Sequence, residues 1–384
     1  MRVSYVSIVA ALLSVVSAKI CTNQSVPIHI TSRNGLFGHV AVPETNRDAT
    51  NFTLSLGRQG HNFTNEGLAG YHTISKTYHI MTQYCTPDHP TKKDPAIQIL
   101  THGIGFDRTY WDTSYHDFQQ SYVNVAVDKF GYYTLSFDRL GIGESSHGDP
   151  RDEIQSFLEV QAIRALTICL REGSFPNVHH KFSKIIHTGH SFGSAQTYSL
   201  TAMYPDISDG IVLTGFSVNG SFAPSYFDIA GNWVQAALNV PKRLGGYPRG
   251  YLVASNTEAL EILFLFPGHF PPGLLDLAEE TKIPVSIGEL LTLGSIPASN
   301  PYKGPVLVFT GEHDVPFCGG DCLATGDPSL ASIPAAVAKS FPNTKDFEAY
   351  IQPQTGHGLT FHNNVTAGYE VIQRFLESKG LKST

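Results

Sequence analysis

From about residue 95 onward, short and continuously apolar segments alternate with segments of helical periodicity. Continuous apolar strands are typical of a parallel sheet that helices cover on both faces, because neither side of such a strand meets solvent. The pattern therefore predicts an α/β fold with a mostly parallel sheet. The expected strands are residues 97–101, 132–137, 184–188, 210–214, 306–310 and 348–352, and the clearest expected helices are residues 154–171, 192–203 and 366–376.

Two parts of the chain fall outside this rhythm. Before it, residues 26–31 and 76–84 alternate like half-exposed antiparallel strands around an Asn/Gly/Thr-rich stretch. Between the fourth and fifth core strands lie roughly ninety residues, a connection long enough to predict an inserted subdomain, with a lid as the preferred interpretation. The expected division is a signal peptide at 1–18, N-terminal strands and a glycosylated extension at 19–94, a core at 95–215 and 301–384, and a lid at 216–300.

The first eighteen residues have the pattern of an export signal. Arg2 precedes an apolar run over residues 6–16, and Val16-Ser17-Ala18 is a small-residue cleavage site. A short amphiphilic anchor is the alternative, and no later segment has the length and apolar character of a membrane span. We therefore expect a secreted protein. Five Asn-x-Ser/Thr sequons agree with this route, at Asn23, Asn51, Asn62, Asn219 and Asn364.

The five cysteines fit an oxidising compartment with two disulfides and one remaining thiol. Cys318 and Cys322 are close enough in sequence to close a small loop, which leaves Cys21 and Cys85 as the plausible second pair. Cys169 lies in an apolar helical run, so we expect it to be a buried free thiol.

The net charge and the spacing of possible metal ligands limit which partners and cofactors are expected. The formal net charge is −7 and no cluster of Lys and Arg occurs, so neither nucleic acid nor an anionic membrane is an expected partner. Cys318 and Cys322 could be half of a metal site, but no second Cys or His pair with suitable spacing lies nearby. We expect no metal and no cofactor.

The sequence Gly189-His190-Ser191-Phe192-Gly193 matches the Gly-x-Ser-x-Gly motif. It follows an expected strand and opens an expected helix, which is the context of a nucleophile elbow. There, a serine sits on a tight turn, and the flanking glycines let the strand and the helix pass closely. The alternative is an incidental turn in a glycine-rich chain.

A second turn, His102-Gly103-Ile104, follows the first core strand. In this architecture that position supplies one backbone donor to an oxyanion, and the residue after the serine supplies the other. The backbone N–H groups of Ile104 and Phe192 are therefore the expected pair. A His-Gly turn that merely ends a strand is the alternative.

An acid and a histidine follow the last two core strands. Asp314 comes after the fifth strand and His357 after the sixth, so both side chains should reach the sheet edge that carries the serine. Glu312 and Asp321 are rival acids. His362 is the rival base, although its place near a helix start favours a surface or capping role. Serine needs such a base, because its hydroxyl is a poor nucleophile near neutral pH.

With these motifs in order, residues 95–384 resemble the α/β-hydrolase family of the AB hydrolase-1 type. Residues 137–145, Phe-Asp-Arg-Leu-Gly-Ile-Gly-Glu-Ser, are similar to the family's Asp-x-x-Gly-x-Gly-x-Ser loop, which implies that Asp138 and Arg139 brace the site. The sequons and the Cys318 to Cys322 element resemble secreted fungal members. The Ile104-Gly105 pair departs from the Gly-Gly-Gly turn of many lipases, so a large acylglycerol is less expected as substrate.

The resemblance and the motifs together predict a secreted serine hydrolase with Ser191, Asp314 and His357 as catalytic residues. Its substrate would be a mostly apolar small molecule with a carboxylic ester or related acyl bond. The same residues also suit lactone, thioester, amide or carbon–carbon cleavage, or acyl transfer. A non-catalytic binding module on a hydrolase scaffold is the remaining alternative.

Overall fold

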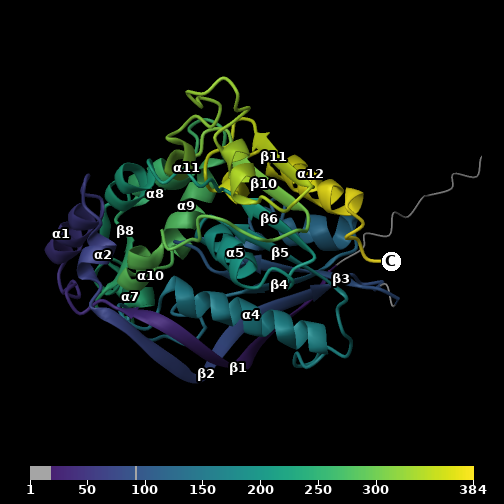
Figure 1. Ribbon diagram of the computed structural model, residues 1–384, viewed down its shortest axis with the longest axis horizontal. Coiled ribbons are helices and arrows are strands. Elements are labelled where there is room, and N and C mark those ends of the chain that lie inside the picture. The colour runs from purple at the N-terminus through teal and green to yellow at the C-terminus, as the bar shows by residue number, and fades with distance from the viewer. Residues whose placement is uncertain (1–18, 91–92) are drawn as a thin grey trace, which may run out of the picture.

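An eight-stranded sheet forms the centre of the computed structural model, which describes residues 19–90 and 93–384 (Figure 1). The strand order is β1-β2-β4-β3-β5-β6-β10-β11, and the six strands from β4 to β11 pair in parallel. The signal peptide expected at residues 1–18 lies outside the described residues. The strands are β1 (Ile20–Leu36), β2 (Gly70–Thr86), β3 (Ala96–Thr101), β4 (Tyr133–Phe137), β5 (Lys184–His190), β6 (Gly210–Thr214), β10 (Val306–Gly311) and β11 (Phe347–Gln352).

Helices cover both faces of the parallel strands. Ile97 and Ile99 of β3 join the hydrophobic cluster that contains the buried side of α4 (Ser156–Glu172). Leu100 of the same strand joins the cluster that contains the buried side of α12 (Val365–Ser378). Because successive strand residues face opposite sides, this burial explains the continuous apolar runs in the sequence. The predicted α/β architecture is confirmed.

The two N-terminal strands form a long antiparallel hairpin. Strand β1 pairs with β2 along its whole length, and β2 also pairs antiparallel with β4, which joins the hairpin to the main sheet. Cys21 and Cys85 are cross-strand neighbours and form a disulfide. The strands extend well beyond the expected residues 26–31 and 76–84, because their polar ends are too exposed to show apolar alternation.

Residues 216–300, which we call the cap, carry a second sheet. Within the described chain, β7 (Trp233–Gln235), β8 (Tyr251–Ala254) and β9 (Val285–Ser286) pair antiparallel in the order β7-β8-β9. The remaining cap elements are the π-helix η3 (Pro224–Ile229) and the helices α6 (Ala236–Asn239), α7 (Pro241–Leu244), α8 (Thr257–Phe264), α9 (Pro272–Thr281) and α10 (Ile287–Thr292).

The segment between β1 and β2 packs onto the cap rather than forming a separate extension. It contains α1 (Asn46–Leu56) and α2 (Phe63–Gly67), which lie at the left of Figure 1; α1 packs on β7 and η3, and α2 packs on α10. The Asn46 Oδ1 atom accepts a hydrogen bond of 3.0 Å from the backbone N–H of Gln235 on β7. The Thr64 hydroxyl donates to the Leu291 carbonyl on α10 at 2.8 Å. The segment between β1 and β2 therefore packs against the outer side of the cap and stabilises it.

The remaining elements belong to the core. They are η1 (Arg108–Trp111), α3 (Tyr122–Asn124), η2 (Val125–Lys129), α5 (Phe192–Met203), α11 (Val315–Cys318), η4 (Pro334–Ser340) and η5 (Leu359–Phe361).

No helix in the described part of the chain combines the length and apolar character needed to cross a bilayer.

Candidate active site

Ser191 lies on the sharp turn between β5 and α5. Its backbone has φ 56° and ψ −118°, a left-handed conformation that is strained for a residue with a side chain. The turn closes because its glycines have no Cβ: one added at Gly189 would lie 2.3 Å from the Gly193 carbonyl oxygen, and one at Gly193 would lie 2.2 Å from that of Thr101. The motif spacing thus reflects the close passage of strand and helix.

Ser191, His357 and Asp314 are joined by two hydrogen bonds. The Ser191 Oγ atom lies 2.8 Å from His357 Nε2, and His357 Nδ1 lies 2.6 Å from Asp314 Oδ2. The second carboxylate oxygen of Asp314 accepts from the Phe317 backbone N–H at 2.8 Å. Because a carboxylate only accepts, His357 Nδ1 carries the proton and Nε2 is free to accept from the serine. The arrangement can therefore move a proton from Ser191 to His357.

All three side chains are sheltered from water. Ser191 is 6% exposed, His357 is 1% exposed and Asp314 is fully buried. The Phe264 ring from the cap helix α8 stacks on the His357 ring at 5.9 Å, and the Gly358 N–H donates to the Phe264 carbonyl at 2.6 Å. The cap thus covers the histidine directly.

The rival acids face elsewhere. Glu312 accepts a hydrogen bond from the backbone N–H of Gln354, and Asp321 accepts one from that of Leu323. Of the three candidate acids, Asp314 is the one bonded to His357.

The disulfide between Cys318 and Cys322 closes the loop that follows Asp314. The Cys318 and Gly320 N–H groups both donate to the Asp314 carbonyl, at 3.2 and 3.0 Å. Cys169 is free, as expected, but it is only partly buried.

His362 has a structural role, and the expectation of a surface or capping position was wrong. Its side chain is fully buried, and its Nε2 atom accepts from the backbone N–H groups of Gly356 and Phe266 at 2.9 and 3.0 Å. Its Nδ1 atom donates to the Gly358 carbonyl at 3.0 Å. Burial lowers the pKa of His362 to about 4. The neutral ring therefore braces the loop that carries His357, a role that sequence position alone does not reveal.

The turn at His102, Gly103 and Ile104 lies against the serine. A Cβ added at Gly103 would come within 2.9 Å of the Ser191 Cβ. His102 Nδ1 donates to the Gly103 carbonyl at 2.8 Å, and its Nε2 accepts from the Arg139 N–H at 3.1 Å. Burial, with the charge of Arg139 beside it, lowers the pKa of His102 and keeps the ring neutral. These bonds fix the turn in place.

Phe192 is the first residue of α5, so its backbone N–H has no acceptor within the helix. Ile104 is 1% exposed and follows Gly103 directly. The structure therefore brings the residues of both expected oxyanion donors close to Ser191.

Arg139 ties this turn to the cap. Its guanidinium is 1% exposed and pairs with Glu159 on α4 at 2.8 Å and with Glu289 on α10 at 2.5 Å. The neighbouring Asp138 carboxylate accepts from the Arg108 guanidinium at 2.6 Å, and burial raises its pKa to about 6. Both residues thus brace the surrounding loops.

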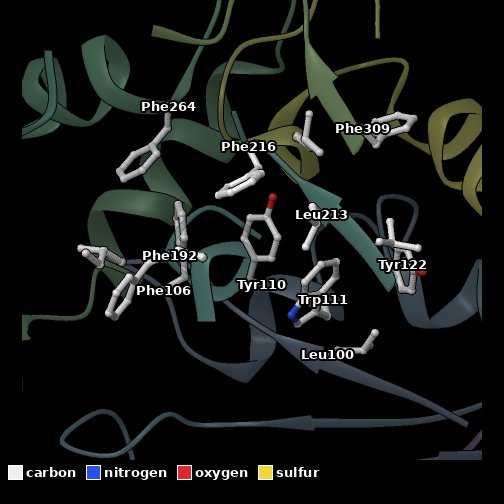
Figure 2. Close-up of a cluster of buried hydrophobic side chains, with 14 of the residues drawn as sticks. Leu100, Phe106, Tyr110, Trp111, Tyr122, Phe192, Leu213, Phe216, Phe264 and Phe309 are labelled. Atoms are coloured by element: carbon white, nitrogen blue, oxygen red, sulfur yellow. The ribbon is translucent and has the colours of Figure 1, made fainter. Parts of the chain in front are cut away.

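Aromatic side chains enclose the site. Figure 2 shows a buried row that runs from Phe106 and Phe264 through Tyr110 to Trp111. Phe106 lies 4.8 Å from Phe264 and 4.9 Å from Tyr110 between ring centroids, and Tyr110 lies 5.2 Å from Trp111. This row joins the cap residue Phe264 to the loops that follow β3.

The sequons lie in different surroundings. Asn23, Asn51 and Asn62 are exposed, and Asn219 is partly exposed. The Asn364 Nδ2 atom, to which a glycan would be attached, donates a hydrogen bond to the Pro353 carbonyl at 2.7 Å. Glycosylation remains a prediction, and Asn364 is the site that the structure favours least.

Sequence reasoning missed one buried acid near the site. Asp228 on η3 is 7% exposed and lines a cavity whose wall also includes Ala195 and Phe317. Its only sequence signal is an acid next to the aromatic residue Phe227, and that pattern does not predict burial.

Comparisons with known proteins reveal the fold through structure rather than sequence. No family model and no curated protein sequence matches the chain. A thermophilic esterase from Thermogutta terrifontis, solved with malate bound, is similar with a TM-score of 0.53 and 16% identity, over 80% of this chain and 95% of that one. A membrane phospholipase A, described as a bacterial virulence factor, is similar with a TM-score of 0.50 and 13% identity, over 78% and 84%. The chain has the α/β-hydrolase fold.

Proposed function

We propose that this α/β-hydrolase-fold chain is a serine hydrolase that cleaves a carboxylic ester or related acyl bond in a mostly apolar small molecule. The observation that supports it best is the continuous hydrogen-bonded path from Ser191 through His357 to Asp314. The strained serine turn is a second support, because such strain is typical of functional sites.

In the proposed mechanism, Ser191 Oγ attacks the substrate carbonyl while His357 Nε2 accepts the hydroxyl proton. The negative oxygen of the tetrahedral intermediate accepts hydrogen bonds from the Ile104 and Phe192 N–H groups. His357 then donates its proton to the leaving alcohol, and an acyl-enzyme remains. Water, deprotonated by His357, releases the acid and restores Ser191. Asp314 holds the imidazole tautomer and stabilises its protonated form.

The surroundings favour an apolar substrate. Phe264 and Phe317 lie beside the His357 ring, at 5.9 and 5.6 Å between centroids. The two similar structures are described as an esterase and a phospholipase A, names that are compatible with ester cleavage. In this proposal the cap acts as a lid, with Phe264 over the catalytic histidine.

We further propose that the protein is secreted. Two disulfides are compatible with an oxidising compartment. Mass determination of the protein from a culture medium would test both the cleavage after Ala18 and the glycans on the exposed sequons.

A fluorophosphonate probe tests the nucleophile, since an activated serine attacks phosphorus and stays bound to it. We expect labelling at Ser191 in the native protein. Ser191→Ala and His357→Ala should each abolish labelling and lower turnover of the best p-nitrophenyl ester by roughly 10⁴-fold or more, and the two losses should not add. Ser199→Ala is the matched control, because this buried serine lies on the same helix and its hydroxyl has no partner among the described residues.

Two outcomes would contradict the proposal. If Ser191→Ala keeps wild-type turnover, the nucleophile lies elsewhere. If folded wild-type protein ignores the probe and hydrolyses no member of a panel of esters, amides and thioesters, a binding role replaces the enzymatic one.

A further inference from the structure

A cavity of about 330 Å³ lies where the cap meets helix α5 and α11, and we call it the cap pocket. Its lining includes Ala195, Phe216, Ser217, Asp228, Leu290 and Phe317. Leu56 and Thr64, from the segment between β1 and β2, form part of its outer wall.

The cap pocket borders the catalytic residues. Ala195 lies one turn after the serine on α5, and its N–H donates to the Ser191 carbonyl at 3.1 Å. The Phe317 ring lies 5.6 Å from the His357 ring, and the Phe216 ring lies 5.7 Å from that of Phe317. The wall of the cap pocket is therefore one residue removed from both Ser191 and His357.

Asp228 is the one acidic residue among the described residues that line this pocket. It is 7% exposed, and its Oδ1 atom has no hydrogen-bond partner among the described residues. Burial raises the pKa of Asp228 to about 7, and no ion pair with another described residue offsets that burial. A buried carboxyl without a partner is costly, and native proteins rarely keep one without a use.

Local packing holds Asp228 in place. Its neighbour Phe227 is buried against Trp233, with ring centroids 5.3 Å apart, and the Trp233 Nε1 donates to the Phe227 carbonyl at 3.1 Å. This packing fixes the backbone that carries the carboxyl.

We propose that the cap pocket binds the non-reacting part of the substrate and that Asp228 accepts a hydrogen bond from a hydroxyl or protonated amine on it. This inference rests on the proposed function and adds a substrate class to it: esters with an apolar segment and a hydrogen-bond donor. The aromatic and aliphatic walls contact the segment, and the donor bonds to the Asp228 carboxyl, which lines the pocket. A hydrocarbon of equal size would leave the carboxyl without a partner, so the pocket discriminates against it.

Matched substrates test this selectivity. We would compare p-nitrophenyl esters whose acyl chains of equal length end in methyl, hydroxyl or ammonium, over a series of lengths. At the length that spans the pocket, the wild type should favour a donor-bearing ester over its methyl counterpart by at least about tenfold in kcat/KM. Asp228→Leu should invert that preference. Asp228→Asn should keep the preference for hydroxyl but lose that for ammonium, which distinguishes the two donors.

Asp276→Leu is the matched control, because Asp276 is an exposed acid on the cap helix α9. It should leave every substrate ratio unchanged. If Asp228→Leu also leaves the ratios unchanged at every length while the probe still labels Ser191, the inference is wrong and the proposed function stands.

Ligand binding to a variant without turnover tests the role of Asp228 independently. In the Ser191→Ala background, 1,6-hexanediol or hexylammonium should raise the melting temperature, and adding Asp228→Leu should remove the shift. Equal shifts with and without Asp228→Leu would overturn the assignment.

Discussion

The core and the cap each bury an aspartate, and the two carboxylates have opposite surroundings. Asp314 in the core uses both oxygens, one with His357 and one with the Phe317 N–H. Asp228 in the cap has an oxygen without a partner among the described residues, although it is nearly as buried. A fully bonded carboxylate has one stable position and can orient another group. A buried carboxyl with an unpartnered oxygen has no such fixed position, which agrees with the substrate contact proposed for Asp228.

The largest expected effect comes from removing the fully bonded carboxylate. Asp314→Asn should lower turnover by up to roughly 10⁴-fold, because an amide no longer fixes the His357 tautomer that accepts from Ser191. The fold should persist, since the Phe317 N–H can still donate to the amide oxygen. Turnover of a methyl-terminated ester and circular dichroism measure the two effects.

The corresponding substitution in the cap should have a much smaller effect on turnover. Asp228→Asn should lower turnover of the same methyl-terminated ester by less than about tenfold, because Asp228 has no part in the proton transfer. Comparable losses at both positions would show that the two aspartates do not have separate roles.

Another substitution, Arg139→Leu, leaves two buried carboxylates without their shared partner. Arg139→Leu leaves Glu159 and Glu289 without their shared guanidinium, so the free energy of unfolding should fall by about 3–5 kcal/mol. Urea unfolding measures this loss. Arg374→Leu is the control, because its pair with Glu370 is exposed and should contribute less than about 1 kcal/mol. Equal stability of the Arg139 variant and the wild type would mean that this ionic cluster does not hold the cap to the core.

The core was predictable because its signals are local. The helix expected at residues 192–203 is found at Phe192–Met203, and the strand expected at 97–101 is found at Ala96–Thr101. Ser191, Asp314 and His357 follow strand ends, and a parallel sheet necessarily brings such residues to one edge.

The cap was not predictable in the same detail. Strands β7, β8 and β9 have three, four and two residues, too few to show an alternating pattern. The packing of α1 and α2 on the cap depends on contacts between distant segments. The burial of Asp228 and of His362 likewise follows from tertiary packing, which composition and spacing do not record.

The last predicted effect concerns pH and the buried carboxyl of the cap. The pKa of Asp228 is about 7 in the folded protein, against an ordinary value of 3.8. Between these values the folded chain keeps a proton that the unfolded chain has lost, so the stability of the wild type falls as pH rises. Below about pH 4 both states are protonated and the penalty is absent. Above about pH 7 it reaches at most about 4 kcal/mol.

Asp228→Asn removes this ionisation. The variant should therefore gain stability relative to the wild type between pH 4 and pH 8, measured as the difference in unfolding free energy from urea titrations. Other groups, such as Asp138, titrate in both proteins and cancel in that difference. Asp276→Asn, which changes an exposed acid of the same cap, is the control. A constant difference for Asp228→Asn would mean that the carboxyl already has a partner in solution, and the contrast between cap and core would then disappear.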